Sequence, residues 1–187
     1  TRQSAQLRML RGDQLRAQVR MTVDASLERA AQQLREDARE QVTTVRDGRW
    51  ARPLQSQVPL PVQLQLVDAQ SMFNLRNLLA HGRPDPDARH AFIALCAGQG
   101  LGQGACASAA EHIQARLRDG DIQAQAPLPR ESLIEQAFAG SDPLAVQALA
   151  RRTVVLPAQT LVNANTCDLS VLQAVAPEVE RGPLQHA

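Results

Sequence analysis

Residues 1 to about 46 carry apolar positions at helical spacing on an otherwise polar and charged segment. Most steps between them are four residues, which places them on one stripe of a helix: Leu15, Val19, Val23, Leu27, Ala30, Leu34, Ala38, Val42 and Val45. Asp47 and Gly48 end the pattern, as turn-forming residues do at helix ends. A small core cannot cover a stripe of this length. We therefore predict that part of it packs on the domain and the rest contacts a partner; an ordinary long helix in a bundle is the alternative.

A different periodicity follows the long helix. Residues 49–61 show little pattern and contain Pro53, Pro59 and Pro61. Residues 61–67 then alternate between apolar and polar side chains, with the apolar ones on one face. This alternation predicts a half-buried antiparallel strand.

From Pro84 onward, helix caps and helix breakers divide the chain into short elements. They predict helices over 88–96, 105–119, 130–139 and 143–152, strands over 153–156 and 160–162, and a last helix over 169–176 capped by Asp168. This order predicts an α+β fold in which a long N-terminal helix packs on a small sheet. The helical subdomain would be inserted between strands, which gives segments at 1–83, 84–152 and 153–187.

Composition narrows the function classes. The net charge of +1 provides no field that would attract nucleic acid or anionic lipid. The sequence contains no apolar run of about 18 residues that would span a bilayer, and no signal peptide is visible. Aromatic residues make up only 2% of the chain, so we expect a core of Leu, Val and Ala.

Catalytic and metal-binding patterns are absent from the sequence. The Gly-rich stretch 98–104 follows a predicted helix and lacks the Lys-Ser/Thr ending of a phosphate-binding loop. The four histidines have no partners at metal-ligand spacing. We therefore predict neither an enzyme nor a cofactor site.

Three cysteines remain to be explained. Cys96 and Cys106 flank the Gly-rich stretch, and their spacing is compatible with a disulfide between two helix ends or with two buried free thiols. Cys167 is predicted to fill a small site in the core.

Polar side chains gather at two junctions between predicted strands and helices. Asn74 and Asn77 lie at the first junction, and Asn163, Asn165 and Thr166 lie at the second. Such side chains form hydrogen bonds with nearby backbone groups and turn the chain, so we predict that they have a structural role and hold the loops together. A ligand site is the alternative.

Two of these strings carry a family resemblance. The stretch from Asp68 to Leu78 resembles the signature D-x-Q-x-R-F-N-L-N-x-L of the general secretion pathway protein K family, the large minor pseudopilins of the bacterial type II secretion system. The stretch 156–166 resembles its second signature, L-P-x-x-T-x-x-N-V-N-T-A. Residues 10–17 are similar to the stretch just beyond that family's membrane helix. Met72, Arg76 and Cys167 depart from the signatures, and we expect the first two to face solvent.

The resemblance implies a pilin-like fold and a non-enzymatic role. The protein would sit at the tip of the periplasmic pseudopilus and assemble with minor pseudopilins I and J to initiate or cap the filament. An N-terminal helix absent from these residues would anchor the full-length protein in the inner membrane. Partner contacts are expected on the helical stripe, at Leu15, Val19, Val23 and Leu27.

The resemblance also bears on single residues. A periplasmic setting favours the Cys96–Cys106 disulfide over free thiols. The signature residues are predicted to form a structural motif: Phe73, Asn74, Asn77, Asn163, Asn165 and Thr166. Some family members bind calcium, but no calcium ligands are identifiable in this sequence.

A nucleic-acid-binding module is the alternative function. Residues 162–166, followed by Leu169 and Leu172, resemble the opening of a helix-hairpin-helix. That module needs a Gly-rich hairpin next, whereas here Ala176-Pro177-Glu178-Val179-Glu180 follows. The acidic continuation and the low net charge disfavour nucleic acid as a partner.

Overall fold

The computed structural model describes residues 2–56, 60–121 and 130–178. It divides the chain into two compact units, Thr1–Val67 and Asp68–Ala187, here called the N-terminal unit and the C-terminal unit. Each unit has its own elements and its own hydrogen bonds, and the two are described separately.

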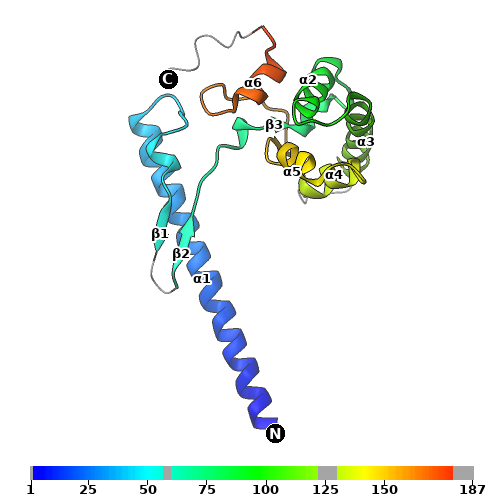
Figure 1. Cartoon of the computed structure of the whole chain (residues 1–187). Coiled ribbons are helices and arrows are strands. Elements are labelled where there is room, and N and C mark those ends of the chain that lie inside the picture. The colour runs from blue at the N-terminus through cyan, green and yellow to red at the C-terminus, as the bar shows by residue number, and fades with distance from the viewer. Residues whose placement is uncertain (1, 57–59, 122–129, 179–187) are drawn as a thin grey trace. The chain divides into compact units, whose positions relative to one another are not determined.

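The N-terminal unit is a helix with a hairpin packed on it (Figure 1). Helix α1 spans Arg2–Glu40, and the 3-10 helix η1 spans Arg49–Ala51. Strands β1 (Leu54–Ser56) and β2 (Val62–Leu64) pair antiparallel, with Leu54 opposite Leu64. Both strands contact α1. This confirms the prediction of a long helix packed on a small antiparallel sheet.

The long helix ends earlier than predicted. Its last residue is Glu40, so Val42 and Val45 lie outside it, and the prediction of a helix to about residue 46 was wrong. The run from Val42 to Val45 is rich in β-branched residues, which lose side-chain freedom in a helix and lower its stability. Val42 is fully exposed, so packing adds nothing to hold it in a helix.

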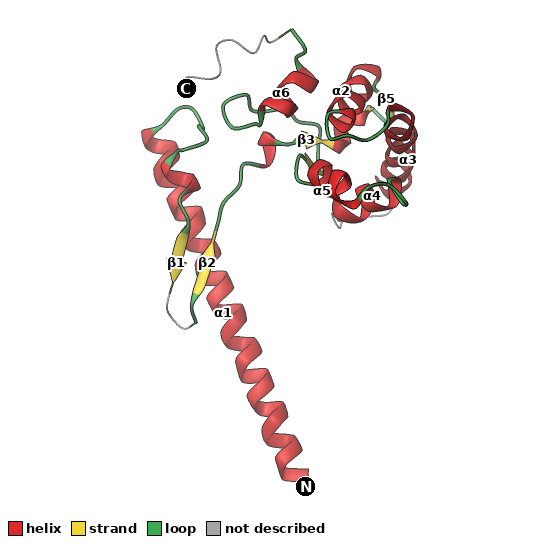
Figure 2. Ribbon diagram, viewed as in Figure 1, coloured by secondary structure: helices red, strands yellow, loops and turns green. Residues whose placement is uncertain are grey.

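The C-terminal unit is mainly helical (Figure 2). Two short strands, β3 (Phe73–Asn74) and β6 (Thr153–Val154), pair in parallel. Between them in sequence lie α2 (Pro86–Ala97), α3 (Gln103–Asp121), α4 (Arg130–Ala137) and α5 (Pro143–Ala150), and α6 (Leu169–Val175) follows. The predicted insertion of a helical subdomain between strands is therefore confirmed.

Short elements lead from β3 into the helices. The 3-10 helices η2 (Ala69–Ser71) and η3 (Leu75–Leu78) flank β3. Strands β4 (Leu79–Ala80) and β5 (Arg83–Pro84) then form a hairpin. Its two-residue turn is His81-Gly82, both at positive φ, the conformation that such tight turns require.

The predicted strand over 160–162 does not form. β6 pairs with β3 instead of joining β1 and β2, and residues 155–163 run as an irregular loop. Both backbone groups of Thr160 are bonded to the Asn77 side chain, so they are not free for a strand ladder.

The apolar core lies in the C-terminal unit. It includes Phe73, Leu75 and Leu78 beside Phe92 and Leu95 of α2, all nearly inaccessible to solvent. The rings of Phe73 and Phe92 pack at 6.0 Å between centroids. A disulfide joins Cys96 at the end of α2 to Cys106 near the start of α3, with Cα atoms 5.9 Å apart. Cys167 is a buried thiol.

Candidate partner interface

Small and polar side chains form the face of α1 that the hairpin covers. Thr22, Ser26 and Ala30 are 1%, 8% and 4% exposed, and Asp37 continues the same side. The hydroxyl of Thr22 donates to the carbonyl of Gln18 at 2.8 Å, and that of Ser26 donates to the carbonyl of Thr22 at 2.7 Å. Burial therefore leaves neither hydroxyl unbonded, and the short side chains let the strands approach the helix closely.

The predicted apolar stripe is not the covered face. Leu15, Val19, Val23 and Leu27 are 53%, 45%, 44% and 54% exposed, and Ala30 is the stripe residue that the hairpin buries. Among the described residues, eight of the fourteen exposed large apolar side chains belong to α1. The N-terminal unit therefore packs through different residues from those the apolar pattern predicts, and it leaves the stripe accessible.

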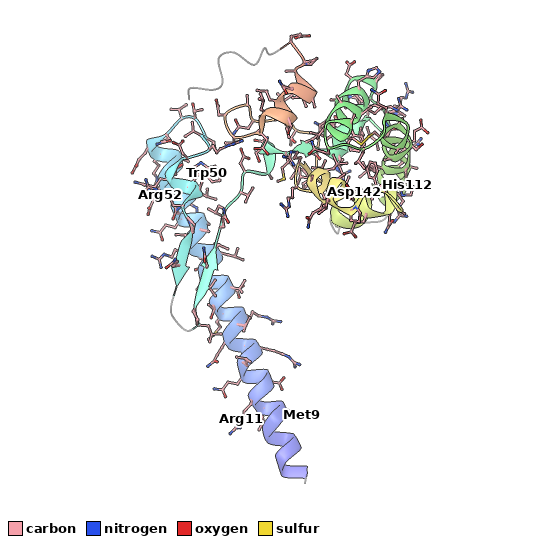
Figure 3. The ribbon with its side chains drawn as sticks, in the orientation of Figure 1. Met9, Arg11, Trp50, Arg52, His112 and Asp142 are labelled. Carbon is pink, nitrogen blue, oxygen red and sulfur yellow. A yellow bond between two sulfur atoms is a disulfide. The ribbon has the colours of Figure 1, made fainter. Side chains whose placement is uncertain are left out.

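The position of the stripe along the helix explains its exposure. Seven residues make about two helical turns, so Leu15, Val19 and Val23 lie in line with Thr22, Ser26 and Ala30. The hairpin covers the second group. Leu15 and Val19 precede that group along the helix, whereas Val23 lies beside it, between the levels of Thr22 and Ser26. Figure 3 labels Met9 and Arg11 on the portion of α1 that extends beyond the hairpin, and Met9 is also exposed. Leu27 continues the line of Leu15, Val19 and Val23 at the same step of four residues, and Leu34 is also exposed, beside the hairpin.

This arrangement is suited to binding another helix. Apolar side chains at steps of four on a straight helix form a ridge that fits the groove of a second helix. Large exposed apolar patches are typical of surfaces that bind partners, which makes these residues the candidate partner interface. We call Leu15, Val19, Val23 and Leu27 the exposed stripe.

The Asn74 side chain makes four hydrogen bonds within the C-terminal unit. It is 1% exposed, and its Nδ2 donates to the carbonyl of Ala158 at 2.8 Å and to Oγ1 of Thr160 at 3.1 Å. Its Oδ1 accepts from the backbone amides of Arg76 and Leu156. All its hydrogen-bonding capacity is used within the protein, so Asn74 holds the loop 155–163 in place.

Neighbouring side chains hold the same loop. Asn77 Nδ2 donates to the carbonyl of Thr160, and Asn77 Oδ1 accepts from its amide. Gln159 donates to the carbonyl of Leu79 at 2.6 Å. Arg76 Nε donates to the carbonyl of Leu156 at 2.7 Å, so the expectation that Arg76 faces solvent was wrong. Arg76, at a position where the signature has Asn, therefore adds a further hydrogen bond to this loop.

Asp68 links the two signature strings, a role that the sequence did not reveal. Its Oδ2 accepts from Asn163 Nδ2 at 2.9 Å and from Thr166 Oγ1 at 2.6 Å, while its Oδ1 accepts from the amide of Gln70. The Asn165 side chain is exposed, and it is the backbone amide of Asn165 that bonds Asn163 Oδ1. Asp68 is the first residue of the stretch that resembles the first signature, and this was the signal in the sequence that pointed to it.

No metal centre is assembled from the described residues. None of their His, Cys, Asp and Glu side chains form a group of three that would hold an ion. Asp85 and Asp142, at the starts of α2 and α5, accept backbone amide hydrogen bonds as helix caps. None of the helices in the described part of the chain combines the length and apolar content needed to cross a membrane.

A long helix, a small antiparallel sheet packed on it and an inserted helical subdomain define a pilin-like fold. The chain is similar to a chain in the crystal structure of the GspK–GspI–GspJ complex from the type 2 secretion system of enterotoxigenic Escherichia coli. The TM-score is 0.68 at 22% sequence identity, over 88% of this chain and 68% of that chain. The fold is thus of the type II secretion pseudopilin kind. No protein-family model and no curated protein sequence matches the chain.

Proposed function

We propose that this protein is a minor pseudopilin of a type II secretion system, of the K kind. It assembles with minor pseudopilins I and J at the tip of the periplasmic pseudopilus, where it initiates or caps the filament. It has no catalytic role and takes neither nucleic acid nor a cofactor as a partner. The full-length protein is anchored in the inner membrane.

Two findings support this proposal, and the second bears on the K kind in particular. The fold resembles a chain of a complex that contains GspK, GspI and GspJ. The two stretches that resemble K-family signatures meet through side-chain hydrogen bonds, with Asp68 and Asn74 on one string and Thr160 and Thr166 on the other. The residues that this chain shares with the two signatures therefore bond the segment that precedes the helical insertion to the segment that follows it.

The exposed stripe on α1 is the observation that carries the proposal. Large apolar side chains on a helix contribute roughly 1.5–3 kcal/mol each when they become fully buried, so leaving several exposed forgoes a considerable stabilisation. A partner helix that covers Leu15, Val19 and Val23 would recover part of it. Contact with a helix of another pseudopilin would bury these side chains in this way.

The test is assembly in solution. The purified chain is mixed with pseudopilins I and J of the same system, and the molar mass of the mixture is measured by light scattering after size separation. We expect a species with the summed mass of the three chains. Separate elution at micromolar concentration, with all three chains folded, would contradict the proposal.

A further inference from the structure

A second surface of the N-terminal unit is polar and rich in arginine. It is a groove of about 400 Å³ between α1 and the segment that follows η1. Its lining comprises Arg29, Gln32, Gln33, Glu36, Arg49, Arg52, Pro53 and Leu54. Figure 3 labels Arg52 and Trp50 beside the C-terminal half of α1. By helical spacing, Gln32 and Glu36 lie about a quarter turn from the hairpin-covered line, on the opposite side from Leu27 and Leu34.

The walls of the groove are fixed by hydrogen bonds. Gln33 Nε2 donates to the carbonyls of Arg49 and Trp50 at 2.9 and 3.3 Å, which ties η1 to α1. Gln32 donates to the carboxylate of Glu36 at 2.9 Å. The indole of Trp50 donates to the carbonyl of Val45 and lies buried behind the same turn. The groove is therefore formed in the unbound protein.

The charges of the groove are only partly neutralised. Arg49 pairs with Glu40 at 3.1 Å. The guanidinium groups of Arg29 and Arg52 make no hydrogen bond or ion pair with any residue in the described part of the chain, and both side chains are exposed. Glu36 is the carboxylate in the lining, against three guanidinium groups. Two arginines are thus available to a ligand.

We propose that this groove binds an acidic segment of a protein partner, one that presents two carboxylates to Arg29 and Arg52. A guanidinium group binds a carboxylate through two parallel hydrogen bonds, which makes arginine effective in such recognition. Six of the eight lining residues are polar or charged, which suits a polar partner better than a lipid surface. The protein would then meet two neighbours at once, an apolar helix at the exposed stripe and an acidic segment at the groove.

The test uses a short peptide of glutamate and alanine, with a glutamine and alanine peptide as its uncharged counterpart. Binding to the full chain is followed by calorimetry and by the emission of Trp50, the single tryptophan, whose backbone carbonyl accepts a hydrogen bond from Gln33 of the groove lining. We expect saturable binding of the acidic peptide alone, weakened by added salt. Replacing both arginines (R29E with R52E) should weaken it about tenfold or more.

A matched double variant separates the groove from overall charge. Arg11→Glu with Arg20→Glu changes the net charge by the same amount, at two positions of α1 that lie outside the groove. This variant should retain most of the binding. Equal losses in the two double variants, or no binding by the unaltered chain, would overturn the proposal. If R29E with R52E fails to fold by circular dichroism, R29Q with R52Q makes the same comparison.

Discussion

The two units of this chain are held together by different means. The C-terminal unit has a continuous core of Phe, Leu, Ile and Ala, a disulfide and a set of buried side-chain hydrogen bonds. In the described part of the N-terminal unit, Ala30 and Trp50 are the buried apolar residues, and most of its large apolar side chains are exposed. Apolar burial is the main source of folding stability, so the C-terminal unit has what it needs within itself. The N-terminal unit keeps apolar surface available for a partner.

The stability of the N-terminal unit can be followed separately, because its unfolding has a fluorescence signal of its own. Trp50 lies in the N-terminal unit, and the chain has no other tryptophan and no tyrosine. Trp50 emission therefore reports on the N-terminal unit, while far-ultraviolet circular dichroism reports on the helices of both. Comparing the two signals in a variant shows which unit the changed residue stabilises.

The largest effect is expected from Asn74→Ala in the C-terminal unit. The change removes four hydrogen bonds at a site 1% exposed and leaves buried backbone groups without partners. We expect a loss of about 3 kcal/mol in the free energy of unfolding, measured by urea denaturation with circular dichroism. Asn165→Ala, at an exposed side chain, is the matched control and should change it by less than about 0.5 kcal/mol. Equal losses of unfolding free energy in the two variants would show that the Asn74 hydrogen bonds do not stabilise the unit.

A slightly smaller effect is expected from removing the Cys96–Cys106 bond. Closing a loop with a sequence separation of 10 restricts the unfolded chain by about 2–3 kcal/mol. The C96S/C106S variant should lose that much stability in the C-terminal unit, and its unfolding should no longer respond to a reductant. Trp50 emission should keep its urea midpoint. A shift of the Trp50 midpoint equal to that of the helices would mean that the units unfold together.

In the N-terminal unit, Ser26→Leu tests the close packing of the hairpin. Ser26 is 8% exposed and adjoins Leu54 and Leu64, so a larger side chain forces the strands away from α1. We expect a loss of about 1–3 kcal/mol, followed by Trp50 emission during urea denaturation. Val23→Leu, one turn away at an exposed position, should have almost no effect. Similar losses in both variants would argue against a specific packed face.

The smallest effect on stability is expected at the exposed stripe. Val19 and Val23 are 45% and 44% exposed, and valine and aspartate have similar helix propensities. The V19D/V23D variant should therefore keep its free energy of unfolding within about 0.5 kcal/mol of the unaltered chain. A loss of several kcal/mol would show that these residues belong to the core of the unit.

Sequence patterns predicted the elements better than the contacts between them. Caps such as Asp85 before Pro86 and Asp142 before Pro143 located helix starts, because a cap acts through residues next to it in the chain. The contact face of α1 was missed because it is made by Thr22 and Ser26, which add nothing to an apolar periodicity. The bond from Asp68 to Thr166 joins residues 98 apart in sequence. Such pairs become visible only when the fold brings them together.

The central claim is that the exposed stripe binds other pseudopilins, and its most direct test is affinity. The dissociation constant of the chain for pseudopilins I and J is measured for the unaltered protein, for V19D/V23D and for Met21→Asp. Met21 is 59% exposed on the opposite side of the same helical turns, so it controls for an added charge. We predict binding weakened about tenfold or more by V19D/V23D and unchanged by M21D. Equal affinities for all three proteins would contradict the claim.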